Sequence, residues 1–205
     1  MRVIAGSAGG VPLSLPKNGL RPTMDLVRGA MFSSLAEHVL GARVLDLFAG
    51  TGSIGIEALS RGAGNATLVE MDRKACTVIA ENLARTRLQA KVVCMDVFRY
   101  LQTSVSIERA DLIFADPPYA KQKGDQDFTR ELLFHPQLPL HLAEDGILIL
   151  EVGERWILPV DAPWVCIRRK KYGSTETLFL RRTAEVQSTE ESNSAPLDSS
   201  AEGTE

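Results

Sequence analysis

The sequence predicts an α/β protein with a mostly parallel sheet that carries helices on both faces. Short apolar runs alternate with segments of helical spacing from residue 44 to residue 152. A parallel strand pair needs a crossover connection, which is usually a helix, so this alternation is typical of β-α-β units. The final segment differs, because two apolar runs flank Tyr172-Gly173-Ser174 as in an antiparallel hairpin. We therefore expect ligands to bind at the carboxyl ends of the parallel strands.

The individual elements follow from local signals. Three glycines and a proline predict a short hairpin or an extended arm over residues 2–15, outside the core. Thr23 is a suitable cap for a helix that Gly41 ends, with an apolar stripe that includes Leu26 and Leu40. Further strands are expected at 44–48, 66–70, 92–95, 112–115, 147–152, 164–169 and 177–180, and further helices from the glycine turn to about 61 and at 73–87, 98–101 and 128–133.

The composition describes one globular domain with a tail. The 205 residues are 44% apolar and 24% charged, which is enough for a sizeable buried core. From residue 184 onward the chain carries six acids and no Lys or Arg, so we expect this tail to be disordered. The other 183 residues hold 23 basic and 20 acidic groups, a balance that permits a polyanionic partner. We expect an arm and helix over 1–40, the main domain over 41–183 and the tail over 184–205.

Several classes of protein are disfavoured. No stretch approaches the ~18 to 20 apolar residues that span a bilayer, and the opening of the chain lacks the apolar core of a signal peptide. We therefore expect a cytoplasmic protein without a membrane partner. Cys76, Cys94 and Cys166 are odd in number and form no C-x-x-C pair, so we expect buried free thiols rather than disulfides or a zinc site. The histidines lack the spacing of metal ligands and are expected on helix surfaces or in loops; they are His38, His135 and His141.

The most informative segment runs from Val44 to Gly55 and reads as a buried strand, a glycine turn and a helix start. Glu70 follows Gly50 by twenty positions, at the end of the next strand. This spacing matches the dinucleotide fingerprint of NAD-linked oxidoreductases, which is one alternative. Asp46 argues for another ligand, because a carboxylate beside the turn repels a pyrophosphate but attracts a cation. S-adenosylmethionine carries a sulfonium and an ammonium group, and Glu70 would accept hydrogen bonds from its ribose hydroxyls.

Two residues after the third expected strand suit the adenine ring of the same cofactor. Asp96 can accept a hydrogen bond from the exocyclic amine, while the backbone of Val97 meets a ring nitrogen. An Asp in this position is also a common helix N-cap, and both roles can hold together. The residues expected to line the cofactor site are Asp46, Phe48, Ala49, Gly50, Thr51, Gly52, Glu70, Met71, Asp96, Val97 and Asp116.

A second motif, Asp116-Pro117-Pro118-Tyr119, ends the fourth expected strand. The two prolines lack N–H groups, so the loop presents hydrogen-bond acceptors. The Asp116 carboxylate and the Pro117 carbonyl suit the two hydrogens of a nucleobase amine, and Tyr119 suits stacking on its ring. Acceptors that hold both hydrogens leave the nitrogen lone pair aimed at a sulfonium methyl. These four residues are therefore the expected catalytic element, and no metal is needed.

Together these motifs resemble the class I S-adenosylmethionine-dependent methyltransferases that act on nucleobase amines. More narrowly, the chain is similar to the RsmD-type 16S ribosomal RNA (guanine-N2)-methyltransferase family. The narrower resemblance rests on Leu20-Arg21-Pro22-Thr23 and on Tyr172-Gly173 with Thr175, in addition to the shared motifs. It implies a Rossmann-like seven-stranded sheet and methylation of the exocyclic N2 amine of a guanine in 16S rRNA. It also implies the small ribosomal subunit, or its assembly intermediate, as the partner, and we expect a monomer.

RNA contact is expected from the arm, the first helix and the final hairpin. The residues expected to contact RNA are Arg2, Arg21, Thr23, Arg28, Arg169, Lys170 and Lys171. A solvated basic face is the alternative for the charged runs. Because the Asp-Pro-Pro-Tyr loop recognises an amine rather than a whole base, an adenine-N6 methyltransferase acting on RNA or DNA stays open. A noncatalytic RNA-binding protein of ribosome assembly also stays open, because it could keep every residue named here.

Overall fold

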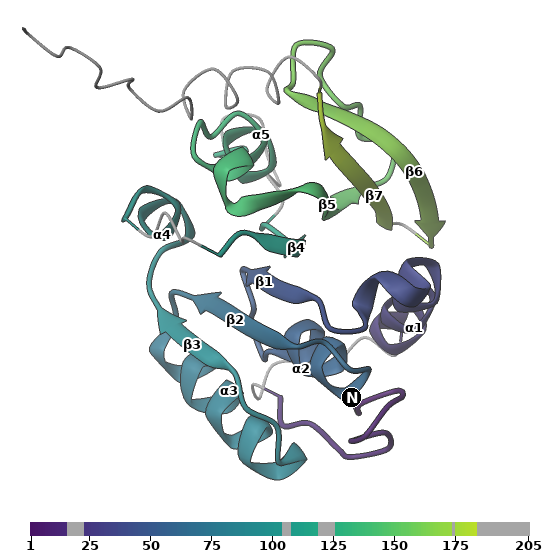
Figure 1. Cartoon of the computed structure of the whole chain (residues 1–205), viewed down its shortest axis with the longest axis vertical. Helices are drawn as coiled ribbons and strands as arrows, with labels where there is room; N and C mark the ends of the chain where they lie inside the picture. Colours follow the sequence, from purple (N-terminus) through teal and green to yellow (C-terminus); the bar gives the residue numbers. More distant parts are fainter. Residues whose placement is uncertain (16–22, 104–107, 119–125, 174, 184–205) are drawn as a thin grey trace, which may run out of the picture.

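The computed structural model describes residues 1–15, 23–103, 108–118, 126–173 and 175–183, so the expectation for the tail lies outside it. Seven strands form one sheet in the order β3-β2-β1-β4-β5-β7-β6 (Figure 1). The strands are β1 Arg43–Leu47, β2 Asn65–Glu70, β3 Lys91–Cys94, β4 Ala110–Ala115, β5 Leu142–Gly153, β6 Trp164–Tyr172 and β7 Thr175–Arg182.

The helices after β1 connect the parallel strands, whereas α1 and η1 precede β1, and β7 lies antiparallel between β5 and β6. The α-helices are α1 Thr23–Leu35, α2 Ser53–Ser60, α3 Arg73–Thr86, α4 Val97–Thr103 and α5 Phe128–Leu133, and the 3-10 helices are η1 Ala36–Val39 and η2 Leu138–His141. The predicted α/β class, the parallel sheet and the closing antiparallel hairpin are therefore confirmed.

Alternate residues of the parallel strands face two different cores. Val44 and Leu68 belong to a core shared with the amino-terminal arm, α1, α2 and α3. Leu45 and Val69 belong to a core shared with α4 and α5. Because β1 lies between β2 and β4, the strand order reverses direction there, which creates a switch point at the carboxyl ends of β1 and β4.

The amino-terminal arm is part of the core, so the expectation that residues 2–15 lie outside it is wrong. Val3, Ala8 and Leu13 are buried in the core that α1 and α2 share. A short antiparallel bridge closes the bend of the arm. Local glycine signals predict such a bend, but the burial of these side chains depends on helices that lie far away in the sequence.

The first helix is shorter than expected. α1 ends at Leu35, and Ala36 has a positive φ of 45° at the start of η1. Leu26 and Leu40, which the sequence places in an apolar stripe, are 73% and 77% exposed. Apolar spacing alone does not separate a continuous α-helix from an α-helix that is followed by a 3-10 turn.

The cysteines do not lie in the core. Cys94 and Cys166 are exposed and Cys76 is half-buried, so the expected burial of all three thiols is wrong. In the residue ranges given above, no group of three or more His, Cys, Asp or Glu side chains is placed to hold a metal ion. No helix within those ranges is long and apolar enough to cross a membrane.

The histidines have different environments. His38 is exposed on η1, whereas His135 and His141 are buried. His141 Nε2 lies 3.1 Å from the carbonyl oxygen of Leu101 on α4. Burial lowers the pKa of both buried imidazoles, so they contribute to packing as neutral rings.

Candidate active site

A tight backbone turn follows β1 at the centre of the sheet. Phe48, Gly50 and Gly52 have positive φ values of 61°, 56° and 74°, so the chain reverses direction over a short segment. A Cβ atom on Gly52 would lie 2.9 Å from the Leu68 side chain, and α2 begins directly after this glycine. The turn therefore holds the backbone against β2 and leaves the strand ends open to a ligand.

Two acids at neighbouring strand ends hold this turn in place. Asp46 Oδ2 accepts a hydrogen bond from the Gly55 N–H at 2.9 Å. Glu70 Oε2 accepts from the Gly50 N–H at 2.8 Å, and Glu70 Oε1 accepts from the Asp72 N–H at 2.8 Å. Each carboxylate oxygen has two lone pairs, so Glu70 can still accept hydrogen bonds from ligand hydroxyls.

Two further acids lie side by side near the ends of β4 and β5. The strands pair with Ala115 opposite Leu150, so Asp116 lies beside Glu151. Asp116 is exposed and Glu151 is half-buried. Sequence reasoning missed Glu151, although its signal is present: it is an acid directly after the apolar run 147–150, near the carboxyl end of an expected strand.

Burial and mutual repulsion raise the pKa of two of these acids. Desolvation raises the pKa of Asp46 to about 7; the Gly55 N–H opposes this shift and the charge of Glu70 adds to it. The pKa of Asp116 is also raised to about 7, first by desolvation and then by the charges of Glu151 and Asp46. Asp116 has one side open to solvent, but the protein around it limits its hydration. Four acids at four strand ends favour a ligand that carries positive charge.

The adenine side of the expected cofactor site contains a cap and a group of aromatic rings. Asp96 Oδ1 accepts from the Arg99 N–H at 2.9 Å, so this residue does cap α4. The Phe48 and Phe98 rings meet edge to face with 6.3 Å between centroids, and Phe98 stacks on Phe128 at 6.1 Å. Sequence reasoning missed Phe98 and Phe128, because aromatic residues on α4 and α5 carry no local signal that they meet.

The other predicted cofactor residues surround the same turn. Ala49 is buried and its N–H donates to a carbonyl of β2 at 3.0 Å. The Thr51 carbonyl accepts from Asn82 Nδ2 at 3.0 Å. Val97 is buried at the start of α4, whereas Met71 is 69% exposed directly after β2. An apolar side chain left open at a strand end is available to a ligand.

Parts of the predicted site are only partly described. Pro117 is buried and Pro118 is exposed, directly after Asp116. The expectations for Tyr119 and Arg21 lie outside the described residues, and Thr23 is the first residue of α1.

Three of the predicted RNA contacts lie on the exposed strand β6. Arg169, Lys170 and Lys171 all face solvent. Arg169 Nη1 donates to Glu176 Oε2 on β7 at 2.7 Å, and Lys171 Nζ donates to Glu154 Oε1 at 2.7 Å. The Lys171–Glu154 pair is exposed and contributes little stability, so a phosphate group can replace the Glu154 carboxylate at low cost. The Glu176 carboxylate is buried, so Arg169 would have to keep this partner while it contacts a phosphate.

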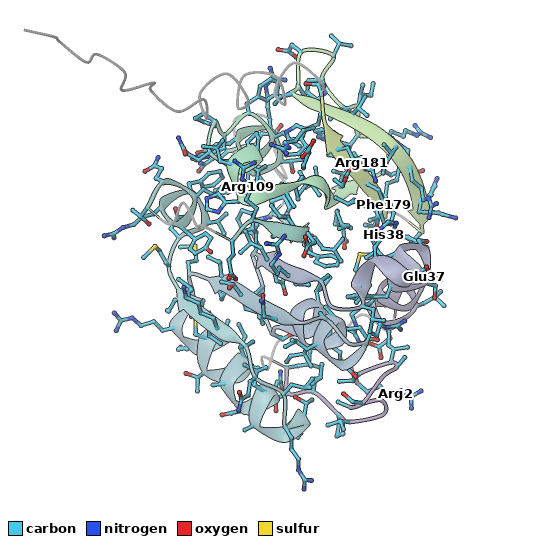
Figure 2. The ribbon with its side chains drawn as sticks, in the orientation of Figure 1. Arg2, Glu37, His38, Arg109, Phe179 and Arg181 are labelled. Carbon is cyan, nitrogen blue, oxygen red and sulfur yellow. The ribbon has the colours of Figure 1, made fainter. Side chains whose placement is uncertain are left out.

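Arg28, which the sequence places among the RNA contacts, lies inside the protein. It is 3% exposed, and its Nη2 donates to the carbonyl oxygen of Arg2 and, at 3.1 Å, to Asp25 Oδ1. Its Nε lies 3.6 Å from Glu57 Oε2. The guanidinium therefore joins the arm to α1 and α2 and cannot reach a phosphate without leaving these partners. Arg2 itself is exposed on the arm (Figure 2).

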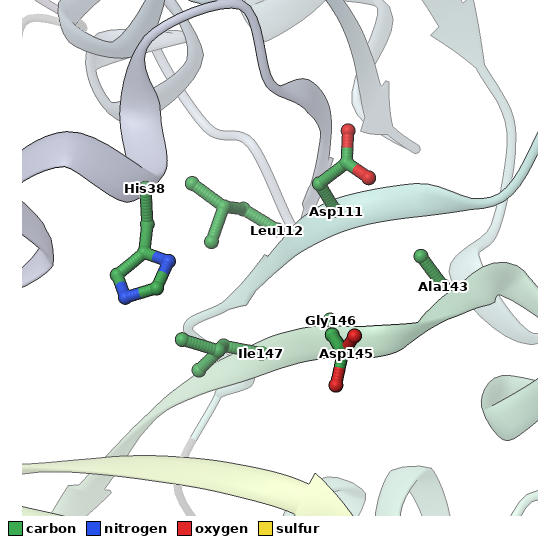
Figure 3. A pocket seen from close by; sticks show the side chains of 7 residues that line it. All are labelled: His38, Asp111, Leu112, Ala143, Asp145, Gly146 and Ile147. Atoms are coloured by element: carbon green, nitrogen blue, oxygen red, sulfur yellow. The ribbon is translucent and has the colours of Figure 1, made fainter.

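A separate cavity of about 210 Å³ lies near the amino ends of β4 and β5. Figure 3 shows Asp111 and His38 among its lining side chains. Asp111 is already paired with Arg43 at 2.7 Å, and the hydrogen bond from that guanidinium holds its pKa below the usual range. The cavity is at the end of the strands opposite to the glycine turn, so it is not part of the candidate active site. Its full lining is His38, Asp111, Leu112, Ala143, Asp145, Gly146 and Ile147.

The switch point, the glycine turn and the acidic strand ends together define a class I S-adenosylmethionine-dependent methyltransferase. Comparison with known proteins narrows this class. A profile of the family described as "Conserved hypothetical protein 95" matches residues 1–181, and the chain belongs to this family. The relatives described next carry methyltransferase names, so the NAD-linked oxidoreductase alternative is set aside.

Individual relatives match this chain over nearly its full length and nearly their own. The chain is 35% identical over 191 residues to "Ribosomal RNA small subunit methyltransferase D" of Escherichia coli, covering 92% of this chain and 93% of the relative. It is 37% identical over 187 residues to "Putative rRNA methyltransferase YlbH" of Bacillus subtilis, covering 89% and 99%. The solved structure of "Putative methyltransferase yhhF from Escherichia coli" superposes with a TM-score of 0.73 at 33% identity, covering 90% of this chain and 98% of that one.

Proposed function

We propose that the chain transfers a methyl group from S-adenosylmethionine to the N2 amine of a guanine in 16S rRNA. The observation that carries this proposal is the place of Asp116. It follows β4 directly, beside the glycine turn after β1 and beside Glu151 of β5. A hydrogen-bond acceptor at that point can hold a nucleobase amine next to a methyl donor in the turn. The names of the Escherichia coli and Bacillus subtilis relatives support rRNA as the substrate class.

The residues of this chain fit the cofactor by charge. S-adenosylmethionine supplies a methyl group bonded to a positively charged sulfur. Desolvation raises the pKa values of Asp46 and Asp116, repulsion by nearby acids adds to both shifts, and a bound cation relieves this repulsion. Glu70 would bind the ribose hydroxyls, Met71 would contact the adenine face, and Asp96 would accept from the adenine amine while it caps α4.

The Asp116 loop would orient the target amine. The Asp116 carboxylate and the Pro117 carbonyl accept its two hydrogens, and two prolines in succession remove competing N–H donors. The amine nitrogen forms a bond to the methyl carbon as the carbon–sulfur bond breaks, and the nitrogen then loses a proton. A carboxylate with a pKa near 7 can take that proton at neutral pH.

The RNA surface that we propose consists of Arg2, Arg169, Lys170 and Lys171. Arg21 and Thr23, which precede or begin α1, would act beside the target base. The substrate is the small ribosomal subunit or its assembly intermediate, which assigns the protein to the cytoplasm, and the chain acts as a monomer. A target base that is stacked would have to be turned out, which costs a few kcal/mol.

A methyl-transfer assay tests this function. Radiolabelled S-adenosylmethionine is offered with small subunits reconstituted from unmodified 16S rRNA, with the naked transcript and with duplex DNA, and labelled nucleosides are identified. We expect N2-methylguanosine from the subunit sample and none with the Asp116→Ala variant. Labelled N6-methyladenosine would instead support the adenine alternative. Absence of label from all samples, with cofactor binding intact by calorimetry, would support the noncatalytic alternative.

A further inference from the structure

Two cysteines flank the end of the strand that carries Glu70. Cys94 is the last residue of β3 and pairs in register with Glu70 on β2. Cys76 lies in the first turns of α3, and its Sγ donates to the Glu70 carbonyl oxygen at 3.3 Å. Cys94 Sγ lies 3.9 Å from the Met71 carbonyl oxygen. The two sulfurs thus contact consecutive backbone carbonyls, and Cys94 contributes to the raised pKa of Cys76, so the thiols are neighbours despite their separation in the sequence.

The two thiols differ in their access to solvent. Cys94 is exposed and meets small oxidants directly, whereas Cys76 is half-buried behind it. Burial and the neighbouring Cys94 raise the pKa of Cys76 to about 12, so its sulfur keeps its proton at neutral pH. Cys94 therefore meets the oxidant first, and Cys76 can react only second, giving up its proton to the departing hydroxyl group as its sulfur forms the new bond.

We propose that Cys76 and Cys94 form a redox-active dithiol that reacts with peroxides, and that its disulfide form weakens cofactor binding. The inference depends on the cofactor role proposed for Glu70 and Met71. It adds a modification site whose two sulfurs contact the backbone carbonyls of Glu70 and Met71 at the end of β2.

The reaction balances with a peroxide as the oxidant. Cys94 sulfur attacks one peroxide oxygen, the oxygen–oxygen bond breaks, and hydrogen peroxide yields a sulfenic acid and water. Cys76 sulfur then attacks the Cys94 sulfur, the sulfur–oxygen bond breaks, and a second water leaves with the Cys76 proton. Two thiols are oxidised to one disulfide while one peroxide is reduced to two waters.

The disulfide affects the cofactor site through the backbone of Glu70. The Glu70 carbonyl accepts from the Met95 N–H at 3.0 Å and from the Cys76 thiol, and oxidation removes the second donor. The new bond also ties α3 to β3 across the segment that contains Asp72. Because the Asp72 N–H donates to the Glu70 carboxylate at 2.8 Å, the ribose-binding oxygens shift with that segment.

The test uses the reduced full-length chain, treated with a small excess of hydrogen peroxide. Peptide mapping without reductant is expected to find Cys76 linked to Cys94. Calorimetry is expected to show S-adenosylmethionine affinity lowered by roughly threefold to tenfold, the effect of one altered hydrogen-bonded contact. Dithiothreitol should restore the affinity.

The controls are two matched serine variants. Cys94→Ser should keep its affinity after peroxide, whereas Cys166→Ser, which alters the exposed cysteine of β6, should respond as the parent chain does. Failure to find the Cys76–Cys94 link, or a link that leaves affinity unchanged, overturns the proposal. Neither readout uses RNA, so failure here is distinct from failure of the proposed methyl transfer.

Discussion

Glu70 accepts the backbone N–H of Gly50 at 2.8 Å, so the acid at the end of β2 holds the turn that follows β1. The same side chain accepts the Asp72 N–H at the start of α3. A residue expected from its spacing to bind a ribose therefore also shapes the backbone around it. Its substitution should affect both the turn and the ligand.

Glu70→Ala should lower S-adenosylmethionine affinity by about tenfold to a hundredfold, because hydrogen bonds to a charged group are worth about 1.5 to 3 kcal/mol. Glu70→Gln keeps one oxygen acceptor and should lose less. Isothermal titration calorimetry measures both variants. Unchanged affinity in Glu70→Ala would place the ribose contact on another residue.

Asp116→Asn should reduce methyl transfer by at least about a hundredfold, the usual contribution of a positioned proton acceptor, while cofactor affinity changes little. The transfer rate of the parent chain should rise as the pH passes through about 7, because the carboxyl must be ionised to accept the amine hydrogens. Single-turnover rates between pH 5.5 and about 8.5 check this profile. A transfer rate that does not change over this pH range would show that ionisation of Asp116 does not control the rate.

Asp46→Asn should change how stability depends on pH. The pKa of Asp46 is raised to about 7 in the folded chain, so the folded state binds this proton more tightly than the unfolded state does. The stability contributed by that proton is full below about pH 4 and is lost as the pH rises to about 7. Asparagine remains neutral and can still accept the Gly55 N–H, so the variant should gain stability relative to the parent from pH 5 to about pH 8. A difference in melting temperature between the variant and the parent that stays constant over this pH range would contradict the raised pKa of Asp46.

Glu57→Ala should release the amino-terminal arm. Glu57 is fully buried and accepts the Ile4 N–H at 2.7 Å and the Ala5 N–H at 3.1 Å. It also lies 2.6 Å from Arg61 Nε and 3.6 Å from Arg28 Nε, and removing a buried carboxylate from such ion pairs costs about 3 to 5 kcal/mol. Denaturant unfolding should show that loss, and hydrogen exchange should speed up at the two arm amides. The matched control Glu37→Ala, at an exposed position on η1, should change neither.

Lys170→Ala should weaken binding to small-subunit RNA. It should also reduce by about one the slope of the logarithm of the binding constant against the logarithm of the salt concentration. Lys91→Ala provides the control, because β3 and β6 form opposite edges of the sheet. Binding titrations at several salt concentrations compare the two. Equal losses in both variants would indicate a general charge effect rather than an RNA surface on β6.

The parts of the fold that were predictable carry their signals locally. The strand that contains Asp46, its glycine turn and the acid at Glu70 follow one another within a short stretch, so spacing alone predicted their arrangement. The aromatic contact between Phe98 and Phe128 and the burial of Arg28 depend on segments that meet only in the folded chain. Whether a residue is apolar or charged gives no information about which distant segment it will contact, so these features could be found only in the structure.

The contacts of the arm also impose an order on synthesis. The Ile4 N–H finds Glu57, and Ser14 exchanges hydrogen bonds of 2.7 Å and 3.2 Å with Asn82. These partners are made 53 and 68 residues later. During synthesis the arm must therefore wait for α3 before it docks, and until then it exposes the apolar side chain of Val3 to chaperones.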